Sequence, residues 1–273
     1  MARAPQTKTD HFFALHRGAT PLLLPNAWDA GSARMFASLG FDAIATTSSG
    51  FAATLGRVDG SVTRDEALAH SAALAAAVDL PVTADLENGY ADAPADVAAN
   101  IARAAETGLA GCSVEDWSGT EIYDAGLAAE RVAAAAEAAH KGDASFVVCA
   151  RAENYLHGRP HLADTIARLR SFQAAGADVV YAPGLRSADD IRAVVDAVDV
   201  PVNVIALPGV PPIPELAKMG VGRVSVGGAF TWAALGAAAD AARELREQGT
   251  YTYFDRAMEG SQIAKAAFTP PER

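Results

Sequence analysis

Two carboxylates and a glycine turn follow a short apolar run in the first third of the chain. Residues 80–84 (LPVTA) precede the segment 85–90 (DLENGY), in which Asp85 and Glu87 supply the acids. Acidic residues are disfavoured inside strands and costly to bury unpaired. At the C-terminal tip of a parallel strand they project into a cleft, where a hard divalent cation such as Mg²⁺ binds carboxylate oxygens. Taken alone, the pattern also fits a strand-end turn with solvated acids.

Polar residues follow several other apolar runs in the same way. The second run is followed by small hydroxyls and a glycine that suit a carboxylate, namely Thr47, Ser48, Ser49 and Gly50. The remaining candidates are Asp59 in the loop beyond them, Glu115 after the fourth run, Arg151 at the end of the fifth, His157 in the next loop, Tyr181 at the end of the sixth and Asn203 in the seventh. On one rim, these acids and the arginine would form a site for a metal ion and an anion.

The segments that must position these residues alternate between two types. Short β-branched runs predict strands at 22–25, 43–46, 81–85, 111–115, 146–151, 179–181, 202–204 and 223–226. Ala-rich segments predict helices at 31–39, 64–78, 95–107, 127–140, 161–175, 188–198, 213–219 and 232–248. Thr63 and Glu66 form a capping box at one helix start, and Gly40, Gly108 and Gly176 mark helix ends.

Strict alternation of strands and helices predicts a parallel sheet. Eight units favour an α/β fold of the (β/α)₈ TIM-barrel type over an open doubly wound sheet, which stays the alternative. We expect one barrel domain over residues 1–273, with an additional C-terminal helical segment at about 232–273. In such a barrel the strand C-termini form the active-site rim. There, His157 is a candidate acid or base, and Tyr181 either contacts the ligand or closes the barrel mouth.

Size, charge and cysteine content limit the class of protein. The chain has 273 residues, with 22 Lys and Arg against 33 Asp and Glu, a net charge of −11. No basic stripe is present, which argues against nucleic acid or an anionic membrane as partner. No stretch reads as a membrane span or a signal peptide, so we expect a cytoplasmic protein. Cys112 and Cys149 are expected to be buried thiols without a disulfide.

At these residues the sequence resembles the isocitrate lyase/phosphoenolpyruvate mutase superfamily over nearly the whole chain. The matching features are the 55–59 loop (LGRVD), the 85–90 segment, the Glu115-Asp116 pair and the 150–153 segment (ARAE). The resemblance implies a Mg²⁺ enzyme, with Mn²⁺ as a substitute, in which Asp85 binds the metal directly. It further implies that Asp59, Glu87 and Glu115 hold the metal through water, with Glu115 also counted among the catalytic groups. The metal would chelate a 2-oxo acid, Arg151 would face the developing enolate, and the 47–49 segment would grip the substrate carboxylate.

One loop departs from the pattern of this superfamily. Carbon–carbon lyases of the superfamily carry a Lys-Lys-Cys-Gly-His motif after the fourth strand, and its cysteine is the acid/base. The corresponding residues 116–124 (DWSGTEIYD) contain no Cys, Lys or His. Phosphoenolpyruvate mutases use a longer loop with a Lys and an Asn, which the chain does not reproduce either. We expect a lid of another composition at 117–124, closing over the cleft.

Breaking a bond next to a 2-oxo group leaves an enolate, which a metal and an arginine stabilise electrostatically. We therefore expect a Mg²⁺-dependent lyase or decarboxylase that acts on a small 2-oxo or 2-hydroxy acid and lacks the lyase cysteine. The alternatives are P–C bond chemistry on a phosphonate, as in a phosphoenolpyruvate mutase or phosphonopyruvate hydrolase, and a barrel that binds metal and ligand without turnover. Trp232 and the aromatic segment 251–254 suggest an apolar surface, so we expect a homo-oligomer, a dimer or a tetramer.

Overall fold

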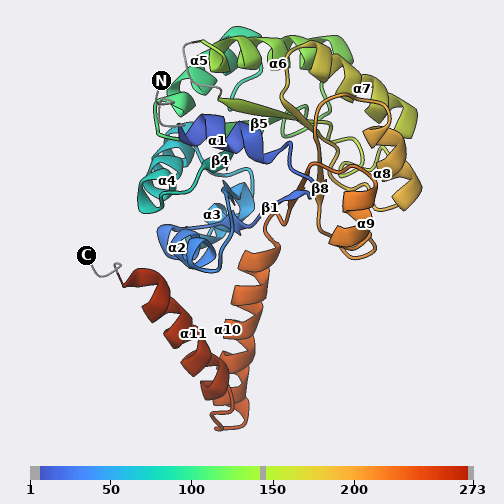
Figure 1. The fold of residues 1–273 in the computed structure, drawn as a ribbon. Helices are drawn as coiled ribbons and strands as arrows, with labels where there is room; N and C mark the ends of the chain where they lie inside the picture. Colours follow the sequence, from blue (N-terminus) through green and yellow to red (C-terminus); the bar gives the residue numbers. More distant parts are fainter. Residues whose placement is uncertain (1–6, 142–145, 270–273) are drawn as a thin grey trace, which may run out of the picture.

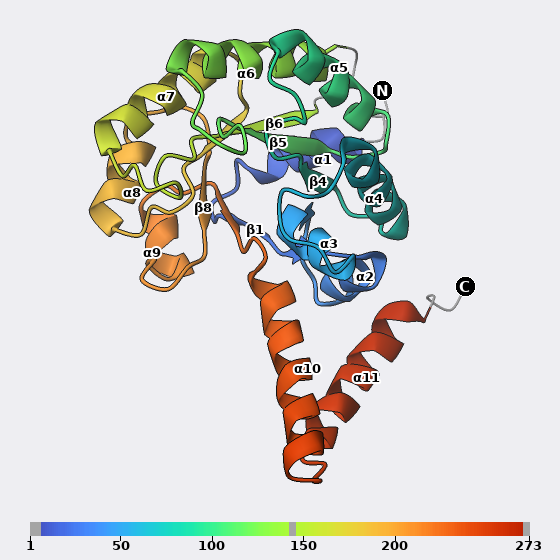
Figure 2. The ribbon, with the colours of Figure 1, turned by 180° about the vertical axis from the view of Figure 1, so that it is seen from behind.

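A computed structural model of the protein describes residues 7–141 and 146–269 (Figure 1). Its strands form one parallel sheet, and the helices α4 to α9 lie around the outside of that sheet (Figures 1 and 2). The strands are β1 (Leu22–Leu24), β2 (Asn26–Ala27), β3 (Ile44–Thr46), β4 (Val82–Asp85), β5 (Gly111–Glu115), β6 (Val147–Arg151), β7 (Val179–Tyr181), β8 (Val202–Ile205) and β9 (Arg223–Ser225).

The sheet closes on itself through its first two segments. Its hydrogen-bonded order runs β1-β9-β8-β7-β6-β5-β4-β3-β2, and only Pro25 separates β1 from β2. Since β1 pairs with β9 and β2 pairs with β3, the nine segments occupy the positions of an eight-stranded ring. The predicted TIM-type barrel is confirmed, and the open sheet is not observed. The predicted strand 22–25 ends at Leu24, because Pro25 has no N–H for the ladder, and the segment β2 beyond it was not predicted.

Most helices follow the predicted alternation. The eight predicted segments correspond to α2 (Ala30–Ser38), α4 (Arg64–Ala77), α5 (Pro94–Ala105), α6 (Ala125–Ala139), α7 (Leu162–Ala174), α8 (Ala188–Val195), α9 (Ile213–Lys218) and α10 (Ala229–Glu247). The expected capping box at Thr63 and Glu66 is present at the start of α4. Not predicted were α1 (Lys8–Leu15), the short α3 (Ser48–Thr54) and the exact extent of α11 (Phe254–Phe268).

Helix α1 closes the N-terminal end of the barrel. Phe12 is fully buried and lies against Gly111, the first residue of β5, where an added Cβ would stand 3.2 Å from the phenyl ring. His16, at the end of α1, reaches Arg223, the first residue of β9. Cys112 and Cys149 are free and fully buried in the strands, as predicted.

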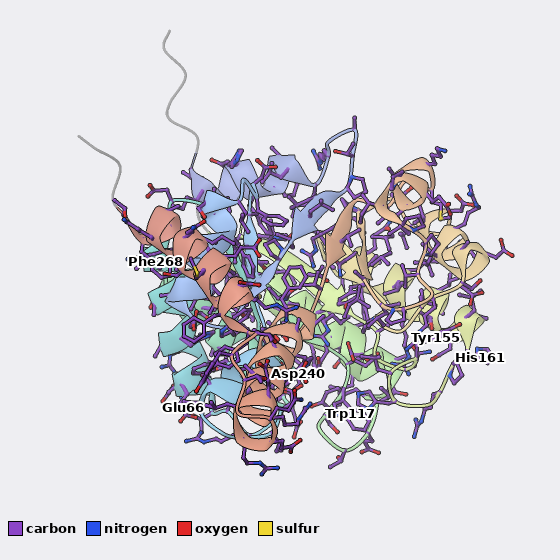
Figure 3. All side chains as sticks on the ribbon, turned by 90° about the horizontal axis from the view of Figure 1, so that it is seen from below. Glu66, Trp117, Tyr155, His161, Asp240 and Phe268 are labelled. Atoms are coloured by element: carbon purple, nitrogen blue, oxygen red, sulfur yellow. The ribbon has the colours of Figure 1, made fainter. Side chains whose placement is uncertain are left out.

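Helices α10 and α11 project from the barrel as an arm (Figures 1 and 2). Seen from below, Asp240 marks α10 and Phe268 marks the far end of α11 (Figure 3). Helix α11 returns to pack against α2, with Phe268 beside Gly31. No side chain of α11 is buried, and Thr231 is the single buried residue of α10. No helix within the described ranges could span a membrane.

Candidate active site

Arg151 lies among three carboxylates at the rim of the barrel. Its guanidinium forms ion pairs of 2.8, 2.9 and 2.8 Å with Asp85, Glu115 and Glu153. Asp85 ends β4, Glu115 ends β5, and Arg151 ends β6 in register with Glu115. Parallel strands bring their C-terminal ends to one rim, which is why residues far apart in the sequence meet here.

Hydroxyl groups complete the surroundings of Asp85. Ser48 and Ser113 donate to its carboxylate at 3.0 and 3.4 Å. The backbone N–H of Asp85 donates to the Thr46 hydroxyl at 2.9 Å, which ties the end of β4 to β3. Sequence reasoning misses Ser113. The available signal is its position two residues before Glu115, which puts both side chains on the same face of β5.

The turn after Asp85 is held in an unusual conformation. Glu87 and Tyr90 have φ values of 47° and 57°, in the left-handed region that residues other than glycine avoid. The buried side chain of Arg131 in α6 donates to backbone carbonyls of this turn, at Asn88, Ala91 and Asp92. A buried arginine therefore fixes the turn that carries Glu87. Sequence reasoning misses Arg131. The one indication of its role in the sequence is that it is a charged residue in an Ala-rich helix.

Burial and neighbouring negative charges raise the pKa values of three rim acids, Glu87, Glu115 and Asp59. Burial, together with the charges of Asp85 and Asp59, raises the pKa of Glu87 to about 7. Burial also raises the pKa of Glu115 well above its ordinary value, which Arg151 offsets only in part. Partial burial and the Asp85 charge raise the pKa of Asp59. Each of these carboxyl groups would be stabilised in its ionised form by a cation nearby.

Burial opposes the charge of Arg151, but its carboxylate neighbours outweigh burial and raise its pKa. The guanidinium is therefore charged at any pH that the protein meets. At the strand ends, the Arg151 guanidinium stands against five acids that line the two hollows described below, namely Asp59, Asp85, Glu87, Glu115 and Glu153. The rim thus has a surplus of hard oxygen donors and of negative charge.

This donor set suits a hydrated divalent cation. Within the described ranges, no three His, Cys, Asp or Glu side chains are grouped so that they could hold a metal together. Mg²⁺ does not require such a group, because it binds one or two carboxylates and keeps several waters. The oxygen donors and the raised pKa values of Glu87 and Asp59 therefore fit Mg²⁺ better than a metal that needs a protein cage.

A cavity of about 220 Å³ extends from this cluster into the barrel. Thr47, Ser48 and Ser49 line it at the start of α3, with Tyr181 and Asn203 on the opposite strands. Its volume is below the roughly 300–1,000 Å³ of drug-sized pockets, so it suits a small acid.

Gly50, the fourth member of the predicted carboxylate-binding segment, does not line this cavity. Its N–H donates to the Thr47 hydroxyl at 3.2 Å, and through this bond Thr47 caps α3. An added Cβ would stand 2.5 Å from Thr47 and 2.6 Å from Thr231, so glycine is needed for close packing here. The structure thus explains Gly50 through helix packing and brings only its three predecessors to the cavity.

A wider hollow of about 760 Å³ adjoins the cavity and shares Ser48, Asp59 and Arg151 with it. His157 lines this hollow and stacks on Trp117, with ring centroids 3.6 Å apart. Burial lowers the pKa of His157, so its ring is neutral at pH 7. The structure therefore places His157 and Tyr181 on two sides of the carboxylate cluster.

The loop predicted as a lid is a small hairpin. Trp117 pairs with Ile122 in an antiparallel bridge, and the Ser118 side chain accepts from the N–H groups of Thr120 and Glu121. Asp116 anchors the base of the hairpin, because its carboxylate accepts from the Glu153 N–H at 2.8 Å and pairs with Arg168 at 3.0 Å. Trp117 lies on this loop in Figure 3. Closure over the cleft stays a prediction.

Comparison with known proteins gives the family. A family model described as phosphoenolpyruvate phosphomutase matches residues 12–246. The chain is 36% identical over 238 residues to the uncharacterized protein Rv1998c of Mycobacterium tuberculosis, covering 86% of this chain and 89% of that one. Less similar relatives have names that include 2-methylisocitrate lyase and oxaloacetate decarboxylase.

Solved structures agree with this result. A protein of Burkholderia cenocepacia, described only as a candidate lyase/mutase, superposes with a TM-score of 0.93 at 49% identity and 96% coverage of both chains. A 2,3-dimethylmalate lyase superposes with a TM-score of 0.84 at 26% identity, covering 96% of this chain and 95% of the other. These matches extend over the barrel and the strand ends that carry Asp85, Glu115 and Arg151. The chain therefore belongs to the isocitrate lyase/phosphoenolpyruvate mutase superfamily of enzymes.

Proposed function

We propose that the protein is a Mg²⁺-dependent enzyme that acts on a small 2-oxo or 2-hydroxy acid through an enolate, as a C–C bond lyase or a decarboxylase. The observation that carries this proposal is the cluster around Arg151, whose guanidinium lies within 2.9 Å of three carboxylates at the strand ends. A fixed positive group beside acids that suit a divalent cation is what stabilisation of an enolate requires.

The roles of the acids follow from their positions. Asp85, at the end of β4, would bind the metal directly, while Asp59, Glu87 and Glu115 would hold its waters. Mn²⁺ would substitute for Mg²⁺ with these oxygen donors. When bound, the metal supplies a Lewis acid that polarises the oxygens of the substrate. Asp85 would then exchange its present contact with Arg151, at 2.8 Å, for the cation.

The remaining rim residues would bind and orient the acid. Thr47, Ser48 and Ser49 line the cavity, and their hydroxyls would hold the carboxylate next to the reacting carbon. Arg151, released in part from Asp85, would donate its N–H groups to the developing enolate oxygen. Because Glu115 and Glu153 hold the other two nitrogens of the guanidinium in place, little reorganisation is needed.

The proton must come from a group other than cysteine. Burial raises the pKa of Tyr181, so its phenol keeps its proton at neutral pH and has one to donate. The guanidinium carbon of Arg151 lies 5.6 Å from the centre of the Tyr181 ring, which puts the phenol beside the site of charge development. His157 is neutral at pH 7 and can accept a proton. We propose Tyr181 as general acid and His157 as general base.

The experiment is a screen of the purified protein with Mg²⁺, and with excess EDTA as the matched control. The panel contains oxaloacetate, 2-methylmalates, phosphonopyruvate and phosphoenolpyruvate, with products followed by NMR. Release of pyruvate that requires both Mg²⁺ and the protein, from oxaloacetate or a 2-methylmalate, supports the proposal. Turnover confined to phosphonopyruvate or phosphoenolpyruvate would assign the site to P–C bond chemistry. Oxalate binding without any turnover over the panel would favour the non-catalytic barrel.

A further inference from the structure

Arg223 places a second positive charge inside the barrel. It is the first residue of β9, lies between β1 and β8 and is only 4% exposed. Together with Asn203 and Ser225 it lines the cavity of about 220 Å³ that also reaches Asp85 and Arg151. The cavity therefore has a guanidinium from the first residue of β9 as well as the one at the strand ends.

The contacts of Arg223 are all to neutral groups. Its Nε donates to the Asn203 side-chain oxygen at 2.8 Å, and one Nη donates to the Cys149 sulfur at 2.8 Å. The other Nη lies 3.4 Å from Nε2 of His16. Since Nδ1 of His16 lies 2.8 Å from the Phe12 carbonyl, which can only accept, Nδ1 carries the proton and Nε2 is the acceptor for Arg223.

Other buried arginines of this protein are satisfied differently. Arg151 pairs with three carboxylates, and Arg131 donates to four backbone carbonyls, three in the 87–92 turn and the fourth that of Glu115. Along the described chain, no carboxylate forms an ion pair with Arg223. A guanidinium has five N–H groups, and the three contacts above leave two of them without an acceptor among those residues.

A buried charge without a counter-ion is unfavourable, since neutral acceptors recover only part of the cost of its desolvation. Sulfur and imidazole are also weaker acceptors than a carboxylate. Asn203 extends the polar surface, because its amide donates one N–H to Ser225 at 3.0 Å and retains a second. The two arginine N–H groups and this amide N–H are donors that a small anion in the cavity would satisfy.

We propose that Arg223, with Asn203 and Ser225, forms a second anion subsite in the inner part of the barrel cavity. Its ligand is an anion of carboxylate size, either a second carboxylate of the bound acid or a free inorganic anion. The first source rests on the proposed function and would make the substrate a dicarboxylic acid. One carboxylate would then lie at the rim with the 47–49 hydroxyls, and the other at Arg223.

The first test uses no variant and does not depend on the proposed function. Crystals of the full chain, free of Mg²⁺, are soaked in sodium bromide, and the anomalous signal of bromide is mapped. We expect a peak at hydrogen-bond distance from the Arg223 guanidinium. Bromide at other surface sites with none at Arg223 would overturn the subsite.

The second test separates the two sources with a matched pair of ligands. Malate and lactate share a 2-hydroxy acid head, and only malate has a second carboxylate. Calorimetric titration in the presence of Mg²⁺ should show that Arg223→Gln weakens malate binding about tenfold and lactate binding by less than about twofold. Arg223→Lys should restore part of the malate affinity, because it keeps the charge without the planar fork.

The outcomes are distinguishable. A bromide peak at Arg223 with malate affinity unchanged in Arg223→Gln would keep the subsite and assign it to a free inorganic anion. Equal losses for malate and lactate, with no bromide peak, would show that Arg223 is a packing residue and would contradict the proposal. If only the proposed function is wrong, malate will bind with the same affinity in Mg²⁺ and in EDTA, and the bromide peak at Arg223 will still be present.

Discussion

At the scale of single residues, the chemistry depends on charges held close together at one rim. Arg151 links three of the rim acids, because it pairs with carboxylates contributed by β4, β5 and the segment after β6. A point charge at the same place would not reproduce this arrangement, since only the planar guanidinium offers several N–H groups in fixed directions.

Arg151→Lys should therefore act mainly on the transition state. We expect kcat on any substrate found in the screen to fall about a hundredfold, while KM changes by less than about threefold. Steady-state kinetics of the two proteins measure both values. Arg192→Lys, on the outer helix α8, is the matched control and should leave both values unchanged. A rise in KM with kcat unchanged would mean that Arg151 only binds the ground-state carboxylate.

The two thiols should be chemically silent in the folded protein. Cys112 and Cys149 are fully buried, and burial raises the pKa of each thiol. Because the thiolate is the reactive form, iodoacetamide should label neither residue and should leave activity unchanged. Intact-mass spectrometry with parallel assays measures both. Rapid inactivation that substrate prevents would identify one cysteine as catalytic and would refute the proposed proton route.

His16 should make stability depend on pH. Burial and then the Arg223 charge lower the pKa of His16 to about 3. In the unfolded chain the pKa of His16 is about 6.5. Below that pH, His16 binds a proton in the unfolded state but stays neutral in the folded state. Stability should then fall as pH decreases from about 6.5 toward about 3. At pH 5 this residue alone should cost about 2 kcal/mol.

Urea unfolding at pH 7.5 and pH 5 tests this, with His16→Gln as the comparison because glutamine keeps a donor and an acceptor. The difference in unfolding free energy between the two pH values should be larger in the wild type than in the variant. Equal pH dependence in both proteins would show that His16 is not held neutral by its surroundings.

At the scale of elements, the sequence predicts the position of a site residue wherever a charged residue directly follows an apolar run, because such a residue marks the end of a strand. Asp85, Glu115 and Arg151 stand directly after apolar runs, and the barrel rule then puts them on one rim. Other residues carried no such mark. Ser113 is one more small residue in a strand, and Arg131 is one charge in an Ala-rich helix, so their roles depend on contacts that no local pattern encodes.

The short helix α3 was also not predictable from the sequence. The 48–54 segment contains Ser, Gly and Thr, which favour turns over helix interiors, and it becomes helical because Thr47 caps its first turn. Arg223 was placed correctly in a strand, but a strand residue is not expected to be charged and buried. The burial of Arg223 and its contacts with neutral groups are evident only in the folded barrel, where β1, β6, β8 and α1 surround it.

At the scale of the whole molecule, the projecting arm is the feature that one chain does not explain. Isolated helices of about 12–15 residues are marginal in water, and α11 has 15 residues of which none is buried. Large apolar side chains along the arm are exposed, including Trp232, Leu235, Phe254 and Met258. Such a surface is stabilised when other copies of the chain cover it.

We therefore expect a homo-oligomer, a dimer or a tetramer, in which the arm lies in the contact. Light scattering after size exclusion should give a mass of two or four chains. Met258→Glu should lower this mass at equal protein concentration, whereas Gln262→Glu on the same helix adds the same charge without removing an apolar side chain and should not. A monomeric wild-type protein would contradict the expectation.

The central claim is that the rim of the barrel binds a divalent cation through Asp85 and thereby binds a small acid. Its most direct measurement is calorimetric titration of oxalate into the full chain with Mg²⁺, repeated with EDTA and with Asp85→Asn, a substitution of equal size. Exposed Asp240→Asn serves as the matched control. We predict oxalate binding that requires Mg²⁺, is lost in Asp85→Asn and is retained in Asp240→Asn. Oxalate binding of equal affinity in EDTA, or undiminished in Asp85→Asn, would contradict the account.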